Sequence, residues 1–100
     1  MKRIKKFSLG NHDYTIRYLK QIYDGDGKAI FGRANPMTNT VEIALMVDNQ
    51  KLSEDVIAHT IHHELSHLIM VLMNEWELNG NEVFIDNLGG LIAQFNKTKR

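Results

Sequence analysis

The chain has 100 residues, of which 43% are hydrophobic, and this suits the one modest core of a single domain spanning residues 1–100. Cysteine is absent, which excludes disulfides and thiolate metal sites, so a zinc site would have to use histidine and carboxylate ligands. The net charge is zero but segregated, because residues 1–37 carry +5, residues 38–96 carry −8 and the last four residues carry +3.

The charge distribution and the apolar runs limit the classes of partner. The acidic region fits a cation site or a preference for basic peptides, whereas the basic segment 2–6 lacks the interleaved aromatic residues of nucleic-acid-binding surfaces. The longest apolar run, residues 68–73, is too short to cross a bilayer, and no signal-peptide pattern follows the basic segment. We therefore expect a soluble, cytoplasmic protein that contacts neither membrane nor nucleic acid; no pattern selects an oligomeric state.

The N-terminal half has the pattern of a sheet. Residues 4–9 alternate weakly and end at a Gly-Asn turn, and residues 14–19 are rich in β-branched and aromatic side chains. The Asp-Gly-Asp-Gly run at 24–27 resembles the start of a calcium loop, but Asn35 stands where the closing carboxylate is expected. A hairpin turn is therefore favoured, with residues 29–33 as the return strand.

The clearest strand covers residues 40–45, where Val41, Ile43 and Leu45 share one face. Two interpretations of it remain open. As an edge strand close to a metal site, it would hold an extended peptide by main-chain hydrogen bonds; alternatively, it is ordinary sheet with its edge covered. Either way, we expect an antiparallel or mixed sheet before the helical half of the chain.

A helix is predicted over residues 54–73. Ser53 is a good N-cap, and Glu54 and Asp55 suit the positive end of the helix dipole. No glycine or proline interrupts the segment. A core stripe recurs along it at spacings of three or four residues, formed by Ile57, Ile61, Leu65, Leu68 and Leu72.

Away from this stripe lies a His-Glu-x-x-His pattern at residues 63–67. On a helix, His63 and His67 stand one above the other, so both imidazoles reach one metal ion, while Glu64 flanks the ion without taking a ligand's place. Random order of the same composition would give roughly 0.014 such matches, so the pattern is specific. Two imidazoles, an open position for water and a carboxylate as general base are the layout of a zinc hydrolase.

Two neighbouring histidines have less defined roles. His59 lies one turn before His63, and it either lines a cleft and helps an oxyanion or is simply packed or solvated, the commoner state of such a residue. His62 points to the flank opposite Glu64, and we expect it at the surface.

A second helix is predicted over residues 81–96. Its core stripe is expected to consist of its large apolar residues, Phe84, Leu88, Leu91, Ile92 and Phe95. Its other face carries Glu82, Asp86 and two glycines at 89 and 90. Glycine inside a helix costs about 1 kcal/mol relative to alanine. Close approach of the two helix backbones would compensate, and it would bring Glu82 to the ion.

Glu82 is thus the preferred third zinc ligand, and Asp86 would accept the free N–H of a ligating histidine. Glu75, Glu77 and Asp86 are competing ligands, of which the first two fall in a polar connection that controls their geometry less. Alternatively, Glu82 only suits the helix dipole, and Asp86 is a solvated side chain.

The His-Glu-x-x-His pattern followed by Asn81-Glu82-x-x-x-Asp86 resembles the gluzincin branch of the zincin metallopeptidases. The small size is similar to that of compact bacterial and phage zinc peptidases of the ImmA/IrrE type. The resemblance implies an α+β fold with a zincin-like minimal core over roughly residues 14–96. It also implies Zn²⁺ bound by His63, His67 and Glu82, with Asp86 supporting a ligand histidine.

The chain departs from the larger gluzincins in two respects. The 15 residues from His67 to Glu82 form a shorter connection than theirs. Those enzymes also use a Tyr or His from a further domain to stabilise the oxyanion; the substitutes in this chain would be Tyr14, Tyr23, His59 or Arg33.

These features predict a zinc-dependent metallopeptidase that hydrolyses peptide bonds in a protein or peptide substrate. Glu64 would act as general base on a zinc-activated water and then pass the proton to the departing amine. The first alternative is a non-catalytic zinc-binding domain acting as a protein-interaction module. The second is a structural pair of helices without metal.

Overall fold

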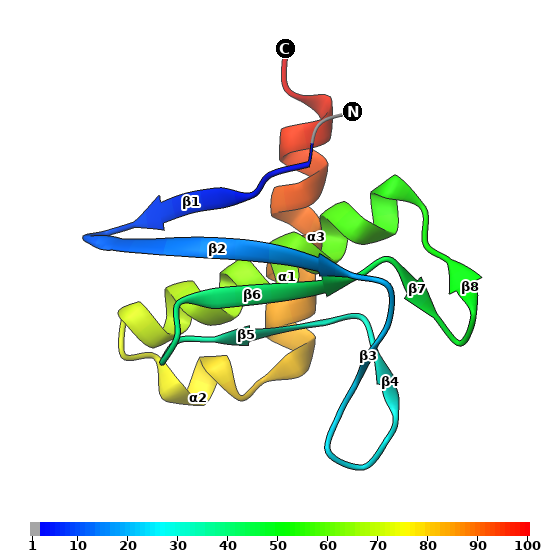
Figure 1. Ribbon diagram of the computed structural model, residues 1–100. Helices are drawn as coiled ribbons and strands as arrows, with labels where there is room; N and C mark the ends of the chain where they lie inside the picture. Colours follow the sequence, from blue (N-terminus) through cyan, green and yellow to red (C-terminus); the bar gives the residue numbers. More distant parts are fainter. Residues whose placement is uncertain (1–2) are drawn as a thin grey trace.

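The computed structural model describes residues 3–100, so Lys2 of the basic N-terminal segment lies outside the described part. The chain forms a compact α+β fold with a mixed sheet in its N-terminal half and helices in its C-terminal half (Figure 1). The predicted α+β class and the order of sheet and helices are therefore confirmed. None of the helices described for these residues is long and apolar enough to cross a membrane.

The main sheet has the strand order β1-β2-β6-β5, formed by β1 (Lys6–Leu9), β2 (His12–Leu19), β6 (Thr40–Ala44) and β5 (Gly32–Asn35). β1 runs antiparallel to β2, β2 runs parallel to β6, and β5 runs antiparallel to β6. The strand predicted over residues 40–45 therefore pairs on both sides, and its interpretation as an edge strand is wrong. The strands at the two edges of the sheet are β1 and β5, and β5 packs against the first helix of the chain.

The predicted hairpin at residues 24–27 is confirmed, between β3 (Ile22–Tyr23) and β4 (Ala29–Ile30). The Asp24 carboxylate accepts hydrogen bonds from the backbone N–H groups of Asp26 and Lys28, so it stabilises the turn. The predicted return strand over 29–33 is divided, because the chain leaves the hairpin after β4 and joins the main sheet as β5. A second small hairpin joins β7 (Met46–Val47) to β8 (Gln50–Lys51).

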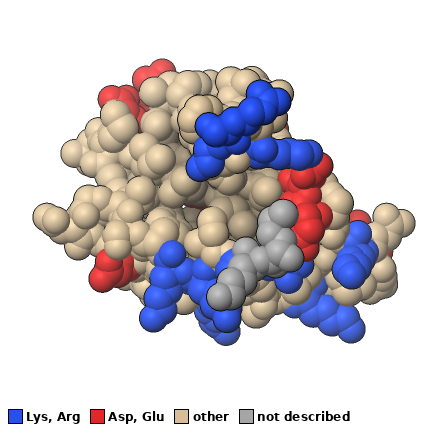
Figure 2. Space-filling model, turned by 90° about the horizontal axis from the view of Figure 1, so that it is seen from above, with Lys and Arg blue, Asp and Glu red and all other residues tan. Residues whose placement is uncertain are grey.

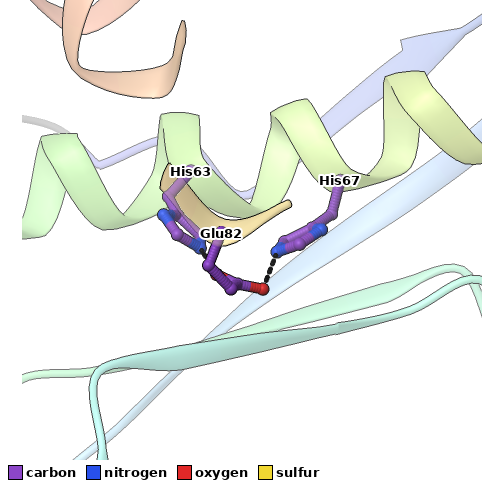
Figure 3. A group of neighbouring side chains, drawn as sticks. All are labelled: His63, His67 and Glu82. Atoms are coloured by element: carbon purple, nitrogen blue, oxygen red, sulfur yellow. Dashed lines mark ion pairs between the residues drawn. The ribbon is translucent and has the colours of Figure 1, made fainter. Parts of the chain in front are cut away.

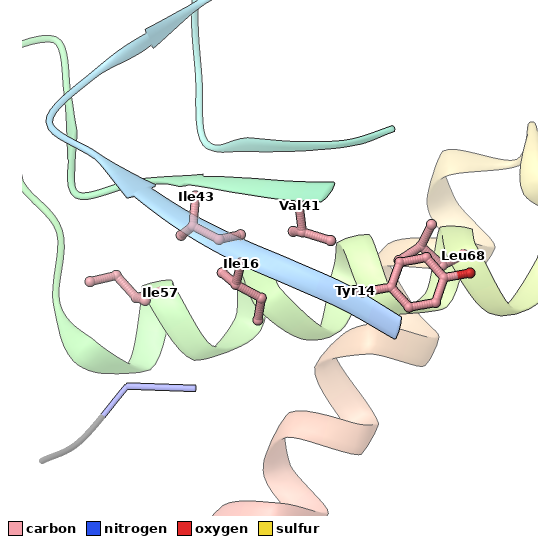
Figure 4. Close-up of a cluster of buried hydrophobic side chains, with 6 residues drawn as sticks. All are labelled: Tyr14, Ile16, Val41, Ile43, Ile57 and Leu68. Atoms are coloured by element: carbon pink, nitrogen blue, oxygen red, sulfur yellow. The ribbon is translucent and has the colours of Figure 1, made fainter. Parts of the chain in front are cut away.

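The core lies between one face of the main sheet and the first helix, α1 (Glu54–Leu72) (Figure 4). It contains side chains from β2, β6 and α1: Tyr14, Ile16, Val41, Ile43, Ile57 and Leu68. The alternation predicted for β6 is borne out, because Val41 and Ile43 are buried on the same face and Leu45 packs against the cluster.

α1 matches the predicted helix closely. The Ser53 side chain caps it by accepting a hydrogen bond from the Val56 N–H at 3.2 Å. The helix ends at Leu72, and Asn74, with φ at +58°, changes the direction of the chain after it. Of the predicted core stripe, Ile57 and Leu68 are buried, but Leu72, in the last turn of the helix, is exposed.

Both basic ends of the chain meet the acidic first turn of α1. Arg3 pairs with Glu54 at 2.7 Å, and Lys97 pairs with Asp55 at 2.9 Å. Figure 2 shows this face of the molecule, on which basic and acidic side chains adjoin. The charge segregation along the sequence is thus partly neutralised in space.

After α1 the chain forms a short helix, α2 (Trp76–Asn79), and then the long helix α3 (Glu82–Thr98). α3 was predicted in nearly these bounds, and Asn81 caps it by accepting from the Phe84 N–H at 3.0 Å. α2 lies in the polar connection between the two predicted helices, for which no helix was expected.

α3 packs on α1 through its glycine-bearing face. Gly89 is buried, and a Cβ atom placed on it would lie 2.7 Å from the backbone nitrogen of His63. The predicted close approach of the two helix backbones is therefore present. The predicted core stripe of α3 is partly wrong, because Leu91 and Phe95 remain 66% and 65% exposed, whereas Ile85, absent from that stripe, is fully buried.

Candidate metal centre

The structure brings His63, His67 and Glu82 together at the contact between α1 and α3 (Figure 3). Nε2 of His63 lies 3.2 Å from Oε2 of Glu82, and Nε2 of His67 lies 3.2 Å from Oε1 of the same carboxylate. One donor atom from each residue falls within 4.8 Å of the other two. The i, i+4 spacing on α1 and the position of Glu82 in the first turn of α3 produce this convergence.

The other ring nitrogen of each histidine has its own acceptor. Nδ1 of His63 donates to Oδ1 of Asp86 at 3.0 Å, and Nδ1 of His67 donates to Oδ1 of Asn79 at 2.8 Å. These bonds fix the tautomer of a neutral imidazole, so that Nε2 carries the free lone pair. Both lone pairs then point at the Glu82 carboxylate.

This arrangement fits a divalent cation. Two imidazole lone pairs and a carboxylate are all acceptors, and they repel one another unless protons or a cation lie among them. Two histidine nitrogens and one carboxylate oxygen are a ligand set that holds zinc while leaving a position open. His63, His67 and Glu82 are thus the residues that could hold Zn²⁺.

Glu64 lies beside this group without belonging to it. Its side chain is buried, with a relative exposure of 7%, and burial raises its pKa above the ordinary glutamate value. The neighbouring His63 and His67 act in the opposite direction, and Glu82 raises the pKa further. A buried carboxylate with a raised pKa accepts a proton more readily than an exposed glutamate does, which is the property a general base needs.

Asp86 connects the site to a further histidine. Its Oδ1 also accepts a hydrogen bond from Nε2 of His59 at 3.0 Å. The bond from His63 is the main cause of the lowered pKa of Asp86, with a smaller contribution from His59. Asp86 therefore stays ionised and orients His63. This contact between Asp86 and a histidine of the pair was predicted from the sequence.

His62, Glu75 and Glu77, which were also considered from the sequence, lie outside the metal-binding group. His62 is not at the surface as expected: it is half-buried between α1 and α3, donates from Nδ1 to the Ala58 carbonyl at 2.7 Å, and accepts from Asn96. The close approach at Gly89 explains the difference. Glu75 and Glu77, the competing ligands, are exposed and are not among the grouped metal-binding side chains of the described residues.

Of the four candidates for oxyanion stabilisation, the structure places two away from the cleft. Tyr14 is buried in the core, and the exposed Tyr23 donates its hydroxyl hydrogen to Gln21. His59 and Arg33 both line the cleft between β5 and α1, although the guanidinium of Arg33 pairs with Glu42. His59 is the candidate closer to the metal centre, through Asp86.

A cleft runs past the metal centre between β5 and α1. It consists of two hollows of about 500 and 490 Å³ that share Gly32, His63 and Glu64. At Gly32, β5 approaches α1 closely: a Cβ atom at this position would lie 2.8 Å from the Thr60 methyl group, so only glycine fits there without a shift. The first hollow extends past Phe31 and Val56, and the second extends past Pro36 and Trp76.

Two residues of this site were missed from the sequence. Asn79, which orients His67, and Trp76, which lines the second hollow, both lie on α2. A four-residue helix is too short to show a helical period, and its N-cap residue, Glu75, makes no side-chain capping bond. The sequence therefore carried no local signal for either role.

Comparison of the chain with protein-family models, with curated proteins and with solved structures found no match.

Proposed function

We propose that the protein is a zinc-dependent metallopeptidase of gluzincin type, with Zn²⁺ held by His63, His67 and Glu82. The observation that carries the proposal is the convergence of two tautomer-fixed Nε2 atoms on one carboxylate, beside a buried glutamate that takes no part in the group. The resemblance of the sequence to the zincins points to the same residues. The fold, with a mixed sheet edged by β5 and followed by the two site-bearing helices, is compatible with a zincin-like core.

In the proposed reaction, Glu64 transfers protons, and Asp86 and Asn79 orient the histidine ligands. Zinc, when bound, supplies Lewis acidity that activates water and polarises the scissile carbonyl. Glu64 accepts the proton from the attacking water and delivers it to the departing amine; its burial raises its pKa and so favours the first of these transfers. Asp86 and Asn79 hold the two imidazoles in place, so that little reorganisation is needed during the reaction.

The substrate would lie in the cleft as an extended peptide. β5 is the terminal strand of the main sheet, and three of its residues, Gly32, Arg33 and Ala34, line the second hollow. Among residues 3–100 no strand pairs with its outer edge. A peptide chain is the ligand whose backbone can pair with such an edge.

The alternative function is a structural zinc domain that presents a binding surface. Ligands from α1 and α3 would tie the two helices together, which favours this alternative. However, structural zinc sites have four protein ligands as a rule, and the group contains three. The buried Glu64 also has no role in such a domain.

Substitution Glu64→Gln separates the two functions. The variant should bind zinc in the same stoichiometry as the parent, while cleavage of a diverse peptide pool, followed by mass spectrometry, should fall by about 10²–10⁴-fold. Glu77→Gln, which changes an exposed acid outside the group, serves as the matched control and should cleave normally. Cleavage that is unchanged in Glu64→Gln would rule out its role as the base.

A further inference from the structure

Trp76 is a large exposed aromatic residue within reach of the metal centre. It is the one tryptophan of the chain, and 62% of it is exposed. It begins α2 and lines the second hollow together with His67 and Glu82. Tryptophan buries more apolar area on contact than almost any other side chain, so its exposure beside a ligand group calls for a partner.

The surroundings of Trp76 define what that partner presents. Pro36, Val71 and Leu68 give the hollow apolar walls, and Gly32 and Ala34 of β5 give it a backbone edge. Apolar walls select an apolar side chain, and the backbone edge selects a peptide main chain. A free lipid or sugar offers only one of these two kinds of contact.

α2 also connects Trp76 to the metal ligands. Asn79, one turn after Trp76, accepts the hydrogen bond from Nδ1 of His67. The helix has no side-chain cap at its start, so its contacts with α1 and α3, including the bond from His67, hold it in position. A side chain resting on Trp76 therefore lies against the element that orients one of the imidazoles.

We infer that Trp76 is a specificity-determining residue that binds a large apolar or aromatic side chain of the peptide substrate, on the α2 side of the scissile bond. The inference rests on the proposed peptidase function. It goes beyond that function in naming the substrate class and the residue that recognises it.

Peptide binding to the zinc-loaded Glu64→Gln protein tests this inference without cleavage. The probes are acetylated, amidated pentapeptides of alanine with Phe, Leu or Ser at one position, which is moved along the peptide. Because Trp76 is the one tryptophan, its emission reports directly on contact. We expect the Phe and Leu peptides, in at least one register, to shift the emission at concentrations where the Ser peptides do not.

Substitutions at position 76 complete the test by calorimetry in the same Glu64→Gln background. Trp76→Ala should weaken binding of the Phe peptide at least tenfold and leave the Ser peptide unchanged, whereas Trp76→Phe should recover most of the affinity. Phe95→Ala, which removes an exposed aromatic residue on α3, is the matched control and should bind normally.

Two outcomes would overturn the inference. One is emission that does not respond to any of the peptides, and the other is an affinity of Trp76→Ala for the Phe peptide within twofold of the parent. The proposed function fails separately, if the parent protein binds no zinc or cleaves no peptide. A preference for Phe that is lost in Trp76→Ala but present in Trp76→Phe supports the inference on binding alone.

Discussion

The two faces of α3 differ in a way that their composition does not suggest. The face with the larger apolar side chains leaves Leu91 and Phe95 mostly in solvent, whereas the face with Ile85 and Gly89 is buried against α1. Ile85 and Gly89 form the contact because Gly89 lets the two backbones approach closely. On this face also lie Glu82 and Asp86, so the approach that excludes a Cβ at position 89 brings the two carboxylates to the histidines.

The comparison shows what decides the orientation of a helix that carries part of a site. Burial of apolar area contributes about 25 cal/mol per Å², so it favours packing a helix through the face with the largest apolar side chains. Here that preference gives way to an arrangement in which Asp86 bonds to two histidines and Ile85 is fully enclosed. The glycines, costly in a helix on their own, are the signal of the buried face.

The largest difference between the two faces should appear on truncating their apolar residues. Ile85→Ala should lower the free energy of unfolding by about 2–5 kcal/mol, because it leaves a cavity in a fully buried place. Leu91→Ala, on the outer face, should change it by no more than about 0.5 kcal/mol. Urea unfolding followed by circular dichroism measures both, and similar losses in the two variants would mean that the outer face is buried in solution.

The second test addresses the carboxylates of the inner face through zinc affinity. Glu82→Ala removes a proposed ligand and should weaken zinc binding by more than about 100-fold, whereas Asp86→Asn alters only the support of His63 and should weaken it by about 10–100-fold. Competition with a chromophoric chelator gives both constants. The reverse order would assign the ligand role to Asp86.

The close approach itself is tested at the two glycines. In Gly89→Ala the new methyl group would meet the backbone of His63, so α3 must shift, at a cost of about 1–3 kcal/mol and with a loss of zinc affinity. In Gly90→Ala the nearest atoms to the new methyl group belong to the imidazole of His59, a side chain that is able to move. It should keep zinc binding and be close to neutral in stability. Equal behaviour of the two variants would argue against the observed packing of α3.

The smallest effect concerns the pH dependence of the metal-free protein. The folded-state pKa of Asp86 lies below its ordinary value of 3.8, so its stabilising contribution is present above pH 3.8 and is lost as the pH falls through the lower, folded value. Solvent screens this exposed group, so the effect is small. Asp86→Asn, unfolded in urea with a chelator present, should therefore lose less stability than the parent between pH 5 and about pH 3. A steeper acid loss in the variant would contradict the sign of the shift.

The sequence predicted the parts of the fold that have long, regular patterns. α1 and α3 were found within two residues at each end because they carry strong N-caps and long periodic runs, and β6 was found from its alternation. His63, His67, Glu82 and Asp86 were also placed together correctly, since i, i+4 spacing on two packed helices constrains them. Whether they bind zinc stays a prediction.

The features that could not be predicted from the sequence depend on contacts between separate segments of the chain. The strand order makes β6 internal and β5 the edge, which no local pattern reveals. The half-buried state of His62 follows from the approach of α3, and the roles of Trp76 and Asn79 follow from the placement of a single helical turn.

The zinc content of the purified protein tests the central claim most directly. Native mass spectrometry after purification without chelators, and again after addition of one equivalent of zinc, should show one zinc per chain, and the melting temperature should rise on loading because zinc binds the folded state. His67→Ala should abolish both effects. A parent protein that holds no zinc, and whose melting temperature is unchanged by added zinc, would contradict the account.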